Sequence, residues 1–364
     1  MYRRKLDSYH FPIAASLTGW SGKKGGQLVD LSRFKRVSLG HFPTPLERLE
    51  NLTKRLGGPE IYIKRDDCTG LATGGNKTRK LEYLVADALD KGADTFVTQG
   101  ATQSNHVRQT AAAARRFGMD CYALLERRVT NMGEDYERDG NVLLDDLFHC
   151  HYEFRPEGLD MNAEAQAFGE ELKAKSKRPY IIPGGGSNPV GALGYVQCAE
   201  EIVAQAEEQG IKIDRIVHAT GSAGTQAGLV AGLHSLKSQI EVVGISVRAA
   251  REAQIANVHR LACQTSDLIG DQTPPAVEQV IAYDGYVGPG YGQPTDEMVD
   301  AINTLASEEA ILLDPVYSGK GMAGLIGLIR DGVLKKGENI VFLHTGGSAA
   351  LFAYQHLFSR QQAA

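Results

Sequence analysis

The chain has 364 residues, of which 42% are hydrophobic and 23% charged, and this length suits one large α/β unit or two closely packed domains. Its net charge of -5 comes from interspersed acids and bases, and no apolar run reaches the length of a membrane helix, so we expect neither nucleic acid nor membrane as a partner. The five cysteines are scattered without a CxxC pair, which argues against a disulfide framework and a zinc site and predicts a cytoplasmic protein with reduced thiols and no bound metal.

Short apolar, β-branched runs alternate with longer helical patterns along the chain. Residues 1–40 are expected to form an N-terminal arm or extension. In chain order, the predicted elements are a strand at 61–66, a helix at 77–92, a strand at 95–100, a helix at 104–118 and a strand at 121–126. This order is typical of a parallel sheet that helices cover on both faces.

The same alternation resumes in the second half of the chain. The predicted elements are a strand within 179–186, a helix at 190–210, a strand and helix within 215–235, a strand at 241–247, and a strand within 339–347 that precedes a last helix. The chain therefore consists of two sets of βα units. We place a smaller domain at 80–190 and a larger domain at 1–79 together with 191–364.

Four small-residue turns directly follow predicted strands, at 98–112, 183–195, 219–228 and 344–352. Ligands bind beyond the carboxyl ends of parallel strands, so these turns are expected to converge on one pocket. In the turn at 219–228, backbone N–H groups and hydroxyls could hold a phosphate, although a flexible connection explains this segment alone equally well. It matches neither GxGxxG nor GxxxxGK[ST], which disfavours an NAD enzyme or a nucleotidase.

Lys77 stands in "GGNK", where a turn meets a helix. A desolvated lysine has a lowered pKa and can form a Schiff base, and the nearby phosphate cradle suggests pyridoxal 5'-phosphate as the aldehyde. Taken alone, Lys77 fits a solvated surface lysine better, as do its neighbours Arg79 and Lys80.

Other polar residues also allow two interpretations. Ser104 and Asn105 begin a predicted helix, where capping is their ordinary role, but together with Gln103 they also suit a carboxylate site. Tyr291 and Tyr317 lie in Gly/Pro-rich loops, where tyrosines usually pack, although in a lyase pocket they could transfer protons.

These stretches together resemble the D-cysteine desulfhydrase and 1-aminocyclopropane-1-carboxylate (ACC) deaminase family. The motifs that carry the resemblance are "FPTPLERL", "GGNKTRKLEYL", "QGATQSNHVRQTAA", "PGGGSNPVGALGY", "ATGSAGTQAG", "GPGYGQP", "LLDPVYSGKGMAGL" and "HTGGSAALFAY". They keep the order of the family from about Leu39 to the C-terminus. The resemblance implies an α/β protein of pyridoxal-phosphate fold type II, similar to the tryptophan synthase β-subunit, with two open, twisted, mainly parallel sheets flanked by helices. It also implies a homodimer.

The resemblance assigns a role to each candidate residue. Lys77 would hold the cofactor as a Schiff base, and Tyr291 and Tyr317 would be the active-site tyrosines. Asn105 would bind the cofactor's 3'-oxygen, and Ser104 would lie beside the substrate. The substrate-binding set would be Gln103, Ser104, Asn105 and Tyr291, and the other cofactor-binding residues would be Gly221, Ser222, Ala223, Gly224, Thr225, Ser318 and Thr345.

Two departures from the ACC deaminase pattern bear on the reaction. Ser318 and Thr345 replace a Glu and a Leu, and a hydroxyl near the cofactor's ring nitrogen gives a weaker electron sink than the Glu. A weaker sink suffices when a good leaving group departs from Cβ, so β-elimination to pyruvate and ammonia is favoured.

Within that branch of the family, the substrate is a small cysteine-like amino acid. L-cysteate, which releases sulfite, is slightly favoured over D-cysteine, which releases sulfide. A sulfonate would need extra donors, and the candidates, all of which also fit solvated surface positions, are Arg127, Arg128, Arg248 and Arg251. ACC deaminase and a non-catalytic amino-acid-binding protein remain as alternatives.

Overall fold

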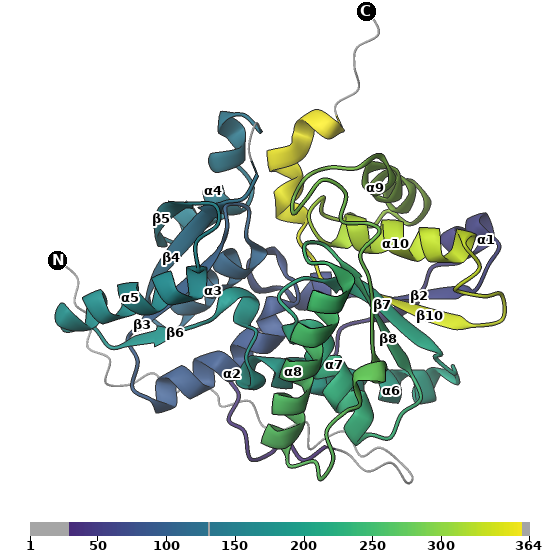
Figure 1. The fold of residues 1–364 in the computed structure, drawn as a ribbon, viewed down its shortest axis with the longest axis horizontal. Helices are drawn as coiled ribbons and strands as arrows, with labels where there is room; N and C mark the ends of the chain where they lie inside the picture. Colours follow the sequence, from purple (N-terminus) through teal and green to yellow (C-terminus); the bar gives the residue numbers. More distant parts are fainter. Residues whose placement is uncertain (1–28, 130–131, 359–364) are drawn as a thin grey trace, which may run out of the picture.

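The computed structural model describes residues 29–129 and 132–358, drawn as a ribbon in Figure 1. Residues 1–28 of the predicted N-terminal extension therefore lie outside the described residues. The described strands form two sheets, one of six strands and one of four, and parallel pairs predominate in both. The prediction of two open, mainly parallel sheets flanked by helices is confirmed.

The six-stranded sheet has the order β1-β2-β10-β7-β8-β9, and only β1 runs antiparallel to its neighbour. Its strands are β1 (Leu46–Arg48), β2 (Glu60–Lys64), β7 (Arg215–Thr220), β8 (Glu241–Ser246), β9 (Val280–Tyr283) and β10 (Asn339–Leu343). Successive side chains of a strand point to opposite faces, and the central strands are apolar on both. Helices therefore cover both faces of this sheet.

One face of the larger sheet carries α6 (Pro189–Gln209), α7 (Gly224–Ser235) and α8 (Arg251–Ile269). The other carries α1 (Glu50–Leu56), α9 (Asp296–Glu309) and α10 (Ser318–Arg330), as Figure 1 shows. Neighbouring residues of β7 therefore belong to different cores: Ile216 packs with the first group of helices and Val217 with the second. The two-residue period of β7 thus builds two cores from one strand.

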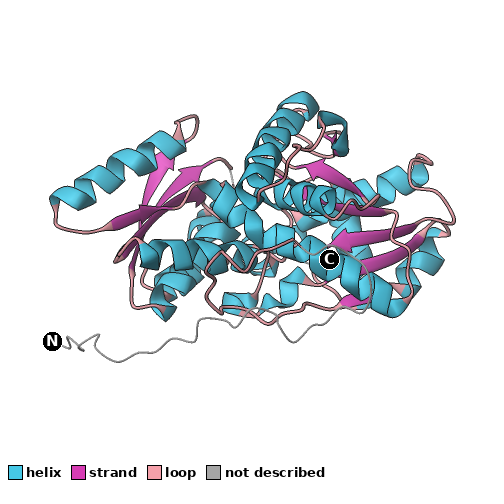
Figure 2. Ribbon diagram, turned by 90° about the horizontal axis from the view of Figure 1, so that it is seen from below, coloured by secondary structure: helices cyan, strands magenta, loops and turns pink. Residues whose placement is uncertain are grey.

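The four-stranded sheet is entirely parallel, in the order β5-β4-β3-β6. Its strands are β3 (Thr95–Ala101), β4 (Asp120–Arg127), β5 (His151–Pro156) and β6 (Pro179–Ile181), and its helices are α2 (Lys77–Asp90), α3 (Asn105–Arg116), α4 (Asn141–Leu147) and α5 (Met161–Ala174). All four strands fall within 80–190, the range that we propose as the smaller domain. Figure 2 shows the two sheets at opposite ends of the molecule, with helices between them.

Helix α2 lies at the centre of this arrangement, because it contacts α3 on one side and α6 on the other. Arg79 and Lys80, which the sequence suggested to be solvated, are consequently only 3% and 1% exposed. That expectation was wrong because a second layer of helix covers the face on which they lie. Arg79 pairs there with Asp66 and Glu201, at 2.8 and 2.9 Å.

Several elements had no clear sequence signal. Strand β5 is half-exposed at a sheet edge and carries few apolar residues, and β9 is an edge strand of only four residues. The expected last helix is a 3₁₀ helix, Ser348–Leu357, which is kinked at Tyr354. None of the described helices combines the length and the apolarity that a bilayer crossing requires.

Candidate active site

A cavity of about 340 Å³ lies at the carboxyl ends of strands from both sheets. All four predicted turns contribute to its lining, which confirms that they converge on one pocket. The contributing stretches are 99–101 and 104–106, 183–185 and 187, 219–223 and 225, and Thr345. The site therefore needs both sheets, and neither set of βα units forms it alone.

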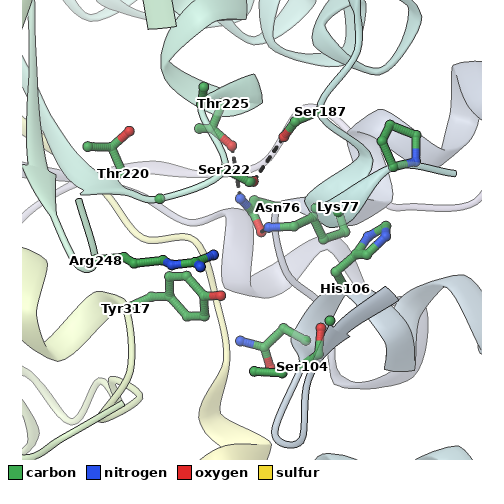
Figure 3. Close-up of a pocket in the computed structure, with 18 of the residues that line it drawn as sticks. Asn76, Lys77, Ser104, His106, Ser187, Thr220, Ser222, Thr225, Arg248 and Tyr317 are labelled. Atoms are coloured by element: carbon green, nitrogen blue, oxygen red, sulfur yellow. Dashed lines mark hydrogen bonds between the residues drawn. The ribbon is translucent and has the colours of Figure 1, made fainter. Parts of the chain in front are cut away.

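Lys77 is the first residue of α2 and points into this cavity (Figure 3). The turn before it requires glycine, because Gly74 has φ of 77° and a Cβ there would lie 1.9 Å from the Asp67 carbonyl oxygen. The Lys77 ammonium donates to Asn76 Oδ1 at 2.9 Å. Burial lowers the pKa of Lys77 to about 8, with a further contribution from the nearby Arg108 cation.

The predicted phosphate cradle is the joint between β7 and α7. Ala223 adopts φ of 75° there, a backbone conformation that residues other than glycine rarely adopt and that is found in turns that bind anions through successive N–H groups. Asn76 Nδ2 donates to Thr225 Oγ1 at 3.0 Å, which links the cradle to the lysine turn. Thr225 and three other predicted cradle residues line the cavity, namely Gly221, Ser222 and Ala223.

Two residues that the sequence did not single out complete the cradle. Ser187 bonds to Ser222 Oγ at 2.9 Å and accepts from the Gly224 N–H at 3.1 Å. Lys80 donates to the Gly185 carbonyl, and its ammonium would lie 2.8 Å from a Cβ built on Gly224. The helical spacing of Lys80, three residues after Lys77, is the one sequence signal that could have found it.

Three adjacent residues, Gln103 to Asn105, prove to have different roles. Ser104 caps α3 by accepting from the Val107 N–H at 3.2 Å, which confirms the capping role, and it also lines the cavity with Asn105, where its role toward a carboxylate stays a prediction. Gln103 does not line the cavity; its amide donates to the backbone carbonyls of Tyr136 and Asp139. The cavity lining therefore gives no support to the expectation that Gln103 binds substrate, and its hydrogen bonds instead hold the neighbouring loop.

Tyr291 and Tyr317 meet in the cavity, with 2.6 Å between their hydroxyl oxygens. Burial raises the pKa of each phenol, so both keep their protons at neutral pH. The Lys77 ammonium lies 6.0 Å from the centre of the Tyr317 ring. The pair thus presents two hydroxyl groups close to the lysine.

The turn that carries Tyr317 is organised by Asp314, which the sequence did not single out. Its carboxylate accepts from the backbone N–H groups of Val316, Tyr317 and Ser318 at 2.8–2.9 Å. The Ser318 hydroxyl donates to the same carboxylate at 2.6 Å and does not line the cavity. Ser318 and Thr345 were both predicted to lie near the cofactor ring, but of these two residues only Thr345 lines the cavity.

The four arginines considered for a sulfonate separate into two pairs. Arg127 pairs with Glu137 at the surface, and Arg251 lies over the Tyr283 ring, so neither lines the cavity. Arg128 and Arg248 do line it, and Figure 3 shows Arg248 pointing inward beside Tyr317. Arg260 on α8 also lines it.

The residues present fit pyridoxal phosphate. The cavity offers a lysine with a lowered pKa, and the β7–α7 joint offers N–H and hydroxyl groups suited to a phosphate. Among the described residues, the Asn105 Nδ2 has no hydrogen-bond acceptor, and the buried His106 Nδ1 has no partner either. Both atoms belong to residues that line the cavity.

Comparison with known proteins agrees with this geometry. Residues 37–346 match the family model described as pyridoxal-phosphate dependent enzyme. The chain is 48% identical over 331 residues to proteins named D-cysteine desulfhydrase from Salmonella schwarzengrund (strain CVM19633) and Salmonella typhi, which covers 90% of this chain and 98% of each relative. A solved structure described as an ACC deaminase homologue is 41% identical, with a TM-score of 0.81 over 90% of this chain and 97% of that chain.

Proposed function

This chain belongs to the family of pyridoxal-phosphate-dependent enzymes, and we propose that it is a lyase that cleaves the Cβ–S bond of a cysteine-like amino acid. In this β-elimination the substrate loses its Cα proton and its sulfur group, which leaves with the bonding electrons, and hydrolysis of the remainder gives pyruvate and ammonia. One observation carries the proposal: Lys77, with its lowered pKa, shares a cavity with an anion cradle and a tyrosine pair.

The chain's own residues divide the work of binding. When bound, pyridoxal phosphate supplies a carbonyl carbon for an amine and a conjugated ring that accepts electrons. Lys77 would hold this carbon, and Asn105 would donate to the ring's oxygen substituent. The residues of the β7–α7 joint, together with Ser187, would hold the phosphate, and Thr345, which lines the same cavity, would contact the cofactor.

Proton transfer is assigned to residues around the substrate. Ser104 and Asn105 would bind the substrate carboxylate, and the Lys77 amine would accept the Cα proton. The Tyr291 hydroxyl, which is kept protonated by burial, donates its proton to the departing sulfur group, and Tyr317 holds Tyr291 in place.

Two substrates are consistent with this chemistry. D-cysteine is supported by the relatives at 48% identity, which carry the name D-cysteine desulfhydrase. L-cysteate, slightly favoured from the sequence, finds no support in those names, but one observation favours it: no Asp or Glu is among the described residues that line the cavity. Three arginines line it instead, which suits a substrate with a second negative charge.

A substrate panel tests the proposal. The holoenzyme is given D-cysteine, L-cysteine, L-cysteate or ACC, and pyruvate or 2-oxobutyrate is measured together with sulfide or sulfite. Pyruvate with an equal amount of sulfide or sulfite is expected from one of the first three. Formation of 2-oxobutyrate from ACC alone would instead identify a deaminase, and no product from any of them would indicate a non-catalytic relative.

The Lys77→Ala variant is the matched control. It is expected to lose the visible absorbance of lysine-linked cofactor together with pyruvate formation, and survival of that absorbance would remove Lys77 from its role. We further propose a homodimer, from the family resemblance, and a cytoplasmic location, from scattered cysteines that are all unpaired. Sedimentation of the purified enzyme tests the first, and fractionation of cells tests the second.

A further inference from the structure

Arg108 on α3 is a fully buried cation at the centre of the site, although it does not line the cavity. Burial lowers its pKa to about 10, which leaves it charged at neutral pH. Its Nη1 donates to Asn105 Oδ1 at 2.9 Å and to Asn141 Oδ1 at 2.6 Å, and its Nη2 donates to the Gly74 carbonyl at 2.7 Å. One guanidinium therefore joins helices α3 and α4 to the turn that carries Lys77.

The contact with Asn105 determines the orientation of that amide. A guanidinium can only donate hydrogen bonds, so the Asn105 atom that faces Arg108 must be the carbonyl oxygen. The Asn105 N–H₂ group is then directed away from Arg108, and no acceptor among the described residues is bonded to it. In this orientation the Asn105 N–H₂ group can donate to an oxygen atom of a ligand in the cavity.

The contact with Gly74 acts on the lysine. Gly74 and Gly75 both have positive φ and lead directly into Asn76 and Lys77. A bond to the Gly74 carbonyl fixes this flexible turn and hence the position from which the Lys77 side chain starts. The Arg108 charge also contributes to the lowered pKa of Lys77, after burial.

We propose that Arg108 is a positioning residue for the cofactor: it sets the Asn105 amide with its N–H₂ group toward the cavity and fixes the turn that presents Lys77. This rests on the cofactor-binding part of the proposed function and not on the sulfur substrate. These three hydrogen bonds need the two separated N–H₂ groups of a planar guanidinium. A lysine has one ammonium nitrogen and cannot donate to Asn105, Asn141 and Gly74 with the same geometry.

The test uses the cofactor-free protein and measures its Kd for pyridoxal phosphate by titration. Arg108→Gln and Arg108→Lys are each expected to weaken binding about 10- to 100-fold, the range found when a partner that orients a metal-binding side chain is lost. Arg115→Gln is the matched control, because this exposed arginine on the same helix also bonds backbone carbonyls, those of Phe148 and His149. Its Kd is expected to stay unchanged.

A double-mutant cycle separates positioning from general damage. If Arg108 acts through Asn105, the loss caused by Arg108→Lys is expected to shrink in an Asn105→Ala background. A second readout is the pH at which the visible absorbance of the bound cofactor changes, which is expected to shift in Arg108→Gln and not in Arg115→Gln. Arg108→Lys keeps the buried charge and thus serves if Arg108→Gln does not fold.

Two results would overturn the inference. One is an unchanged Kd in the folded Arg108→Lys protein. The other is an equal loss of affinity with and without Asn105, accompanied by an unshifted absorbance profile. Failure of the proposed sulfur chemistry is distinguishable, because cofactor binding is measured without any amino-acid substrate.

Discussion

Lys77 differs from an ordinary helical lysine through its surroundings. Within residues 29–129 and 132–358, its ammonium has one hydrogen-bond partner, Asn76 Oδ1, and forms no ion pair with a carboxylate. Desolvation lowers its pKa from 10.5 to about 8, and the Asp314 carboxylate opposes this only in part. A substantial fraction of Lys77 is therefore neutral, and hence nucleophilic, near neutral pH.

We expect the cofactor-free protein to react with pyridoxal phosphate in a pH-dependent way. Because only the neutral amine attacks the aldehyde, the rate should rise about tenfold per pH unit below the pKa and level off above about 8. Stopped-flow absorbance at several pH values measures this rate, and Lys77→Ala gives the background. A rate that still rises steeply above pH 9 would mean that Lys77 keeps an ordinary pKa.

Arg248 is the residue at which the two proposed substrates can be told apart. Its side chain has no hydrogen bond or ion pair with the described residues, whereas Arg128 pairs with Glu126. A hydrogen bond to a charged group contributes about 1.5–3 kcal/mol, and about 1.4 kcal/mol corresponds to a tenfold change in affinity. Arg248→Gln should therefore raise the KM for L-cysteate at least about tenfold. The KM for D-cysteine should stay nearly unchanged, because D-cysteine has no sulfonate.

The control for this prediction is Arg251→Gln, which removes a cation that lies outside the cavity. Steady-state kinetics with both substrates decides the outcome. An equal rise in KM for both would place Arg248 at the shared carboxylate. If the wild-type enzyme does not turn over L-cysteate, its inhibition of the D-cysteine reaction gives the same comparison.

The joint between β7 and α7 shows how a short turn becomes a binding site. A positive φ at Ala223 lets the chain reverse tightly, and α7 then begins beside the cavity, with the Gly224 N–H bonded to Ser187 Oγ and with Ala223 and Thr225 lining the cavity. Gly224, the first residue of α7, has no room for a side chain: a Cβ there would lie 2.6 Å from Ser187 Oγ and 2.8 Å from the Lys80 ammonium.

Gly224→Ala is accordingly expected to weaken cofactor binding. Overpacking of this kind costs about 1–3 kcal/mol, and the atoms that must move are those that form the cradle. Isothermal titration of the cofactor-free protein with pyridoxal phosphate measures the effect. Gly285→Ala is the matched control, because a Cβ there meets nothing within 4 Å, and an equal loss of affinity in both variants would contradict the prediction.

A buried ionic network holds the larger sheet, α2 and α6 together. Arg79 on α2 binds Asp66, which follows β2, and Glu201 on α6, and Lys64 donates to the same Glu201. Burial raises the pKa of Glu201, but Arg79 and Lys64 outweigh it and lower the pKa to about 2. The network therefore remains charged at neutral pH and fixes the helix that begins at Lys77.

Arg79→Met is expected to lower the free energy of unfolding by about 3–5 kcal/mol, the cost of leaving a buried charge without its partner. The exposed Arg116, on α3, gives the control variant Arg116→Met, which should change the stability by less than about 0.5 kcal/mol. Urea denaturation of the cofactor-free proteins measures both. Similar midpoints for the two variants would show that the network contributes nothing to stability.

The sequence by itself determined which chemical groups are available and the order of the βα units. The hydrophobic periods of strands and helices are local properties of the sequence, so the core strands and the glycine turns were predictable. Lys77, Asn105, Tyr291 and Tyr317, which were predicted to share a site, all line one cavity. Short edge strands such as β9 escaped prediction because four apolar residues are too few to distinguish a strand from another buried segment.

Only the tertiary structure decided which polar residues face the cavity and which are buried beside it. Gln103 and Ser318 proved to bond backbone and carboxylate groups, while Arg79 and Lys80 proved to be buried. The physical reason is that the sequence of a helix indicates which of its faces is apolar but not which other helices cover it. Helix α2 is covered by both α3 and α6, so its polar residues are buried as well. The environment of each side chain depends on partners that lie far away in the sequence.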